Sequence, residues 1–202
     1  MRQIETVRRR LIAGIVMAAG LWALPAASDA QTLVGNAKVA RATTFGLLGG
    51  TTTTLASTGA LGGAGDALDA TQVTGSIPSL LGGETLNAAT IGWPDQVVSE
   101  ASLASLGLTV AGVPISADFV MASVTAVLGD AGTAGALVQN LSINGVPIDV
   151  TGEPNQTIAI PGGQVVVNEQ TVSSAGTTVN ALHAVVTGVT DVVVASATAG
   201  IQ

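Results

Sequence analysis

The sequence contains no cysteine and no tyrosine, and it is poor in charged and aromatic residues. Charged residues make up 9% of the chain, against about 25% in an average globular protein. Without cysteine, the chain can form no disulfide, no thiolate metal site and no lipid-modified cysteine. The stability of the fold must therefore come from non-covalent packing and hydrogen bonding.

Basic residues are scarce as well, with six Lys and Arg against 13 Asp and Glu and a formal net charge of −7. Binding to nucleic-acid phosphates requires clustered Lys and Arg, so nucleic acid is excluded as a partner. Apolar residues nevertheless make up 48% of the chain, which excludes intrinsic disorder. A chain of 202 residues with this composition is long enough to bury a sizeable hydrophobic core.

The basic residues are concentrated at the start of the chain. Four of the six lie within the first ten positions: Arg2, Arg8, Arg9 and Arg10. An uncharged run over 11–24 follows, and Ser28 and Ala30 place small residues at positions −3 and −1 of a cleavage site before Gln31. This layout predicts a helical signal peptide over residues 1–30 that is removed on export. An uncleaved anchor is the alternative, but the run is shorter than the roughly 20 residues of a membrane span.

The chain that remains after cleavage is acidic. Its basic residues are Lys38 and Arg41, against 11 carboxylates, which gives a net charge of −9. No apolar stretch beyond Gln31 is long enough to span a bilayer. We therefore expect a secreted protein, in the extracellular space, at the cell surface or in the periplasm, without membrane contact after cleavage. General secretion is favoured over twin-arginine export, because pairs of arginines are common in leaders.

Hydrophobic residues of the mature chain follow the two-residue period of β-strands. The period is clearest over 113–122, where one face is much more apolar than the other. Further short runs rich in Val, Ile and Thr lie at 107–110, 141–150, 157–160, 164–172, 178–187 and 189–197. Turn residues separate these runs, and strands at such spacing predict an all-β fold, an antiparallel β-sandwich built from hairpins, with a barrel as the alternative. A short helical turn around 99–106 is the one departure that the pattern allows.

One internal repeat supports the hairpins. The segment 108–115 recurs as 141–148, with Ala111-Gly112 in the first copy at the place of Asn144-Gly145 in the second. Asn-Gly between two alternating apolar runs predicts a type I′ turn, because both central residues of that turn need a positive φ. We expect two related hairpins that stack in one fold. Two copies do not support a solenoid or a propeller.

The segment 42–70 differs in composition, because glycines alternate there with threonines and scattered leucines. We expect it to form a loop-bearing part of a single domain over residues 31–202. It has too little apolar mass for a core of its own.

Residues that could carry catalysis are few. His183 is the sole histidine, no Gly-x-Ser-x-Gly motif frames a serine, and zinc would need three or four ligands from residue types that are largely missing. We therefore expect His183 to be a structural residue on a strand. The sequence predicts a protein that is not an enzyme, with no catalytic, cofactor-binding or metal-binding residues.

Two pairs of carboxylates and one tryptophan are the remaining candidates. Asp66 and Asp69 follow a glycine-rich stretch that misses the spacing of a calcium turn by one residue. Asp149 and Glu153 flank a turn, where acids are usually solvated rather than catalytic. Trp93 is predicted to be a core plug that closes one end of the sandwich, with an exposed platform as the alternative.

Several segments together carry a resemblance to a known family. They are 99–103, 115–119, 150–157, 166–171, 178–183 and 191–197. These segments resemble proteins of the choice-of-anchor P family, and the likeness is most specific over 99–201. The resemblance implies a secreted bacterial protein whose relatives carry differing C-terminal sorting signals, and it brings no catalytic residue to this chain.

These observations favour a non-catalytic secreted or cell-surface protein with a structural or interaction role, including self-association. Its sheet edges are the expected contact sites with a second copy or another exported protein, because Lys, a common guard of free edges, is nearly absent after Gln31. The rival expectation is a monomer whose edges are covered by 42–70. The alternative function is a ligand- or ice-binding β-domain, suggested by the run from Thr51 to Thr54.

Overall fold

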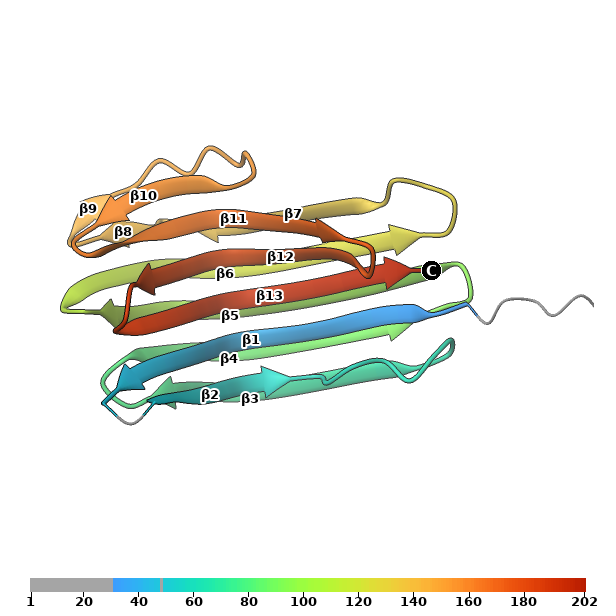
Figure 1. Ribbon diagram of the computed structural model, residues 1–202, viewed down its shortest axis with the longest axis horizontal. Coiled ribbons are helices and arrows are strands. Elements are labelled where there is room, and N and C mark those ends of the chain that lie inside the picture. The colour runs from blue at the N-terminus through green and yellow to red at the C-terminus, as the bar shows by residue number, and fades with distance from the viewer. Residues whose placement is uncertain (1–30, 48) are drawn as a thin grey trace, which may run out of the picture. The chain divides into compact units, whose positions relative to one another are not determined.

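The computed structural model describes residues 31–47 and 49–202, which form two antiparallel sheets packed face to face as a β-sandwich (Figure 1). The predicted all-β sandwich is therefore confirmed. The predicted signal peptide, residues 1–30, lies outside the described residues. Within the described part, no helix has the length and apolar character needed to cross a membrane.

The first sheet has six strands in the order β10-β11-β12-β13-β1-β2. Their bounds are β1 (Leu33–Gly46), β2 (Gly49–Ser57), β10 (Gln156–Ile160), β11 (Gly163–Ser173), β12 (Gly176–Val186) and β13 (Thr190–Ile201). Strand β13, the last strand in sequence, lies between β12 and β1 in this sheet. It pairs with β1 from Leu33↔Ile201 to Thr44↔Thr190. The two ends of the sandwich sequence therefore meet inside one sheet.

The second sheet has seven strands in the order β3-β4-β5-β6-β8-β9, with β7 also paired to β6. Their bounds are β3 (Ala67–Ile77), β4 (Leu81–Gly92), β5 (Gln96–Val110), β6 (Val113–Val127), β7 (Thr133–Gln139), β8 (Ser142–Ile143) and β9 (Val146–Pro147). Most neighbours are consecutive in sequence and joined by tight turns, as expected for a sandwich built from hairpins.

The strands expected over 113–122, 157–160, 164–172, 178–187 and 189–197 are confirmed as β6 and β10 to β13. The helical turn considered for 99–106 is wrong, because these residues lie inside β5. The run over 141–150, with its turn at Asn144-Gly145, forms β8 and β9 on either side of that turn, but each strand has two residues. The sequence pattern thus identified strands after residue 107, whereas β1, β3, β4 and most of β5 were not among the predicted runs.

The segment 42–70 is not mainly loop, contrary to expectation. It contains the end of β1, all of β2 and the start of β3, and 58–66 is the connection between the last two. Threonine is β-branched and suits an extended, pleated backbone, so the run from Thr51 to Thr54 forms a strand despite the glycines around it. Gly49, with φ of 122°, lies at the hairpin that joins β1 to β2.

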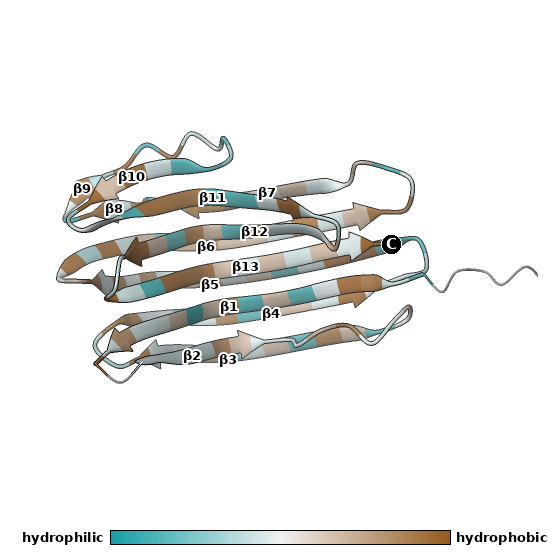
Figure 2. Cartoon of the chain, in the orientation of Figure 1, coloured by the Kyte–Doolittle hydropathy of each residue, from teal (hydrophilic) through white to brown (hydrophobic). Residues whose placement is uncertain are grey.

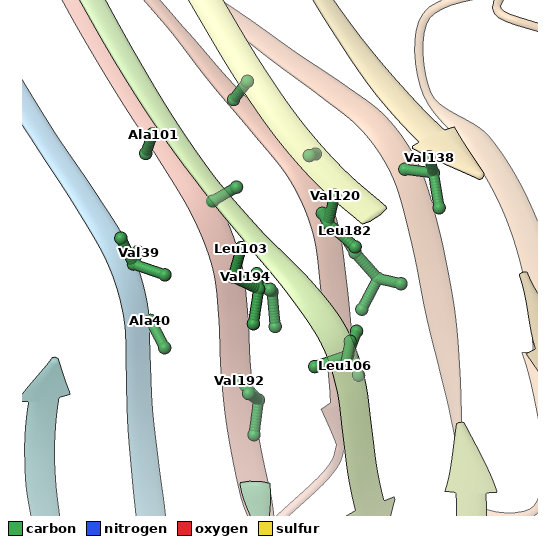
Figure 3. Packing of buried hydrophobic residues seen from close by; sticks show 14 of the residues in the cluster. Val39, Ala40, Ala101, Leu103, Leu106, Val120, Val138, Leu182, Val192 and Val194 are labelled. Atoms are coloured by element: carbon green, nitrogen blue, oxygen red, sulfur yellow. The ribbon is translucent and has the colours of Figure 1, made fainter. Parts of the chain in front are cut away.

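The core consists mainly of small aliphatic side chains from the inner faces of both sheets. Hydropathy alternates along the strands, as Figure 2 shows. Val39 and Val194 of the first sheet and Leu103 and Val120 of the second are fully buried and point into the space between the sheets (Figure 3). Strand β13 packs against both β5 and β6. Apolar burial over this interface replaces the disulfides that the chain cannot form.

A row of irregular residues crosses the six-stranded sheet. The pairing skips one residue on each strand at the same level: Ala56, Val39, Ala195, Ala181 and Asn168. Ala56, Ala195 and Asn168 have positive φ values between 42° and 53°. The pairing register is the same on both sides of the row, but the alternation of buried residues shifts by one on each strand, so residues three apart in sequence face the same side across the row.

The two repeated hairpins lie side by side in the seven-stranded sheet. Gly112 and Gly145 have φ of 81° and 74°, and the residues before them also have positive φ, as a type I′ turn requires. Ile115 of the first hairpin pairs with Ile143 of the second. The turn type and the stacking predicted from the repeat are confirmed.

We predict that Gly112→Val and Gly145→Val each lower the free energy of unfolding by about 1–3 kcal/mol. A Cβ atom at either position meets no atom within 4 Å, so the cost comes from backbone strain alone. Urea denaturation measures the change. Gly107→Val is the matched control, because Gly107 lies on β5 with no positive φ and equally open space. Equal stability of all three variants would contradict the turn assignment.

Candidate functional site

Among the residues that the structure describes, a connected polar cluster surrounds His183 on the outer face of the six-stranded sheet. His183 lies on β12 with 18% of its side chain exposed. Its Nδ1 lies 2.9 Å from Oε2 of Glu169 on β11, and its Nε2 lies 3.2 Å from Oδ1 of Asp191 on β13. Asn180 Nδ2 donates to Oε2 of Glu169 at 2.6 Å, and Arg41 reaches Asp191 at 4.0 Å. Four neighbouring strands are thus tied together by their side chains.

The row of skipped residues explains why these residues share a face. Asn180 and His183 are three residues apart, as are Lys38 and Arg41, so regular strands would place each pair on opposite faces. The skipped residue between the members of each pair restores the common side. Lys38, Arg41 and Asn180 consequently border one shallow hollow of about 200 Å³ on this face.

Glu169 is the group of this cluster whose acidity is shifted. Burial opposes ionisation of its carboxyl, but the hydrogen bonds from Asn180 and His183, together with the charge of a protonated His183, outweigh that effect. The pKa of Glu169 is therefore held below its ordinary value. The ionised carboxylate contributes to the stability of the folded state.

The cluster has the geometry of a structural network. Both ring nitrogens of His183 lie against carboxylates, and no hydroxyl nucleophile is hydrogen-bonded to the ring in the described part of the chain. Residues 31–47 and 49–202 contain no group of three His, Cys, Asp or Glu side chains arranged to hold a metal ion. Sequence reasoning selected His183 but missed Glu169 and Asp191, because nothing in the sequence indicates which carboxylates the strand register places beside the ring.

The other sequence candidates are dispersed. Asp66 accepts the backbone N–H of Gly62 at 2.6 Å within the 58–66 connection, whereas Asp69 lies exposed on β3. Asp149 and Glu153 are exposed and share no hydrogen bond. Trp93 is 42% exposed in the turn between β4 and β5, so its prediction as a core plug is wrong. The connection of three residues, 93–95, leaves this side chain partly exposed to solvent.

The second notable feature is one lateral side of the sandwich, where β2 ends the first sheet and β3 ends the second. The two strands contact each other and lie together in Figure 1. Neither has a strand on its outer side among the described residues. We call β2 and β3 the open edge. All four threonines from Thr51 to Thr54 are exposed there, including the two that face the inner side.

The open edge carries little of the protection that sheet edges usually have. Strand β2 is nine residues long with neither charge nor proline, and β3 is eleven residues long with Asp69 as its one charge. The opposite side is divided among β7, β9 and β10, of seven, two and five residues. Prolines flank or interrupt two of these strands, and the side chain of Gln170 donates to the Ala134 carbonyl of β7. The unprotected backbone is thus concentrated on the β2–β3 side.

Comparison of the chain with protein-family models, curated proteins and solved structures gives no match.

We predict that the protein loses more stability between pH 7 and pH 3 than its Glu169→Gln variant does. Because the folded pKa of Glu169 is lowered, its contribution is fully present above the unfolded value near 4.5 and is lost as the pH falls through the folded pKa. After allowance for solvent screening, the difference should be about 0.5–1 kcal/mol. Urea denaturation at both pH values measures it, with Glu153→Gln as the exposed control. Equal acid sensitivity of all three proteins would remove this role of Glu169.

Proposed function

We propose that the protein is an exported, non-catalytic structural or interaction protein that associates with other exported chains through its open edge. The observation that carries the proposal is the position of β2 and β3, two long, almost uncharged strands that end both sheets on the same side. Their free N–H and C=O groups offer a template on which a further strand can pair.

The segment 42–70 bears directly on this proposal. In a monomeric sandwich this segment would have to cover the sheet edges. It instead supplies β2 and part of β3, which are the free edge strands themselves. Charge does little to oppose pairing at this place, because no carboxylate lies on β2. The net charge of −9 acts at longer range and is screened by salt over about 10 Å at 0.1 M ionic strength.

Export is the second part of the proposal. The basic leader, the uncharged run and the small residues before Gln31 support it. The resemblance of 99–201 to the choice-of-anchor P family is consistent with secretion and with a role outside the cytoplasm.

The alternative is a domain that binds a ligand or ice through its threonines. In β2, however, Thr52 and Thr54 face one side and Thr51 and Thr53 the other. A flat ice-binding face would need threonines that recur on one side over many strands, so this alternative has less support than edge pairing.

We predict that Thr53→Lys abolishes the self-association of the exported protein. Thr53 is exposed and faces the inner side of the open edge, where a lysine charge would have to be buried on pairing. Sedimentation velocity over a range of protein and salt concentrations measures the assembly, and the intact mass of the sample shows whether the chain begins at Gln31.

The matched control is Thr157→Lys, which adds the same charge on β10 at the opposite side. It should associate like the parent protein. Parent protein that stays monomeric throughout, with no exported partner cross-linked on cells, would overturn the proposed function. Equal effects of Thr53→Lys and Thr157→Lys on association would also overturn the proposed function.

A further inference from the structure

We infer that the partner at the open edge is a second copy of this chain, related by a two-fold axis parallel to the strands. In this arrangement β2 of each copy pairs with β3 of the other, so each six-stranded sheet continues into the seven-stranded sheet of its partner. The inference rests on the proposed function and specifies its geometry.

The strand directions permit this pairing. Strands β2 and β3 are joined by 58–66 and run in opposite directions in the sandwich (Figure 1). Rotation about an axis parallel to the strands exchanges the two layers but leaves every strand direction unchanged. Strand β2 of one copy therefore meets β3 of the other in antiparallel orientation, and both junctions form at once.

The rotation also determines the register, because it leaves the level of each residue along the strands unchanged. Within one copy, a Cβ atom on Gly75 of β3 would lie 3.3 Å from Leu55 of β2, so these two residues share a level. Because the two strands are antiparallel, two residues forward on β2, from Leu55 to Ser57, correspond to two residues back on β3 from Gly75. Ser57 therefore lies within one residue of the level of Thr74. On the neighbouring strands, Lys38 pairs with Ser57 and Glu84 pairs with Thr74.

Opposite charges consequently face each other across each junction. Lys38 lies on the outer face of the first sheet, since Ala37 and Val39 beside it are fully buried. Glu84 is exposed on the outer face of the second sheet, since Gly83 beside it faces Leu103 of the core. Strand β1 and the partner's β4 are three strand spacings apart, about 14 Å. The long side chains of Lys38 and Glu84 bring their charges closer than this, to within the screening length of about 10 Å at 0.1 M ionic strength.

The rival two-fold arrangement pairs β2 with β2 and β3 with β3. Each junction then joins two identical strands, so Lys38 of one copy and Glu84 of the other lie on different sheets and neither junction brings them together. Charge complementarity thus favours pairing of β2 with β3.

The same geometry limits the assembly to two copies. Both strands of the open edge are used in one closed contact, and the opposite side offers only the short strands β7, β9 and β10. A closed isologous dimer results rather than a filament.

Charge reversal tests the arrangement on the exported protein. Glu84→Lys should raise the dimer dissociation constant about two- to fivefold, because each dimer contains two copies of an exposed contact. Lys38→Glu should act in the same direction. An equimolar mixture of the two variants should recover dimerisation, since one junction then carries the reversed pair and the other the native pair. Sedimentation equilibrium gives the constants, and thermal unfolding checks that each variant is folded.

Net charge provides the discriminating control. Glu153→Lys makes the same change in total charge far from the open edge, and by reducing overall repulsion it should leave association equal or tighter. If Glu84→Lys also tightens the dimer while Thr53→Lys still abolishes it, the arrangement is wrong and the proposed function stands. Filaments or larger oligomers would likewise overturn the closed dimer. A parent protein that stays monomeric but cross-links to another exported protein on cells would overturn the dimer alone, and one that does neither would overturn both.

Discussion

The burial of small aliphatic side chains between the two sheets is the interaction on which the rest of the structure depends. No cysteine links the sheets, and Val, Leu and Ala fill the space between them, with β13 at the centre. Because each strand must present one apolar face to this space, its other face is free to carry polar residues. The His183 network and the outer-face charges therefore follow from the packing requirement of the core.

The requirement that a strand present an apolar face to the core is weaker at the lateral side formed by β2 and β3. A central strand is covered by neighbours on both sides, whereas residues at the end of a sheet lose that cover, and Thr51 to Thr54 are exposed on both faces of β2. Threonine tolerates this position because it suits an extended backbone while remaining compatible with water. The strand is thus stable enough to form and polar enough to remain soluble, yet it retains the backbone groups that another strand can pair with.

Local pattern accounts for the parts of the fold that were predicted. The alternation over 113–122 and the Asn144-Gly145 turn are local signals, and β6 and the type I′ turn confirm them. Strand β2 was missed because its glycines and threonines obscure the two-residue period of hydrophobic residues. The network around His183 was missed for a different reason: Glu169 and Asp191 lie 14 and 8 residues away, and the pairing register, with the shifted alternation at the row of skipped residues in the case of Glu169, brings them to the ring.

Amide hydrogen exchange of residues 31–202 at several concentrations tests the account most directly. If the open edge pairs with a second copy, protection should increase with concentration in 49–57 and 67–77, while 156–160 on the opposite side changes little. Backbone N–H groups that pair only in the dimer are the source of this difference. Exchange in β2 and β3 that is independent of concentration, in a sample shown to be associated, would contradict the account.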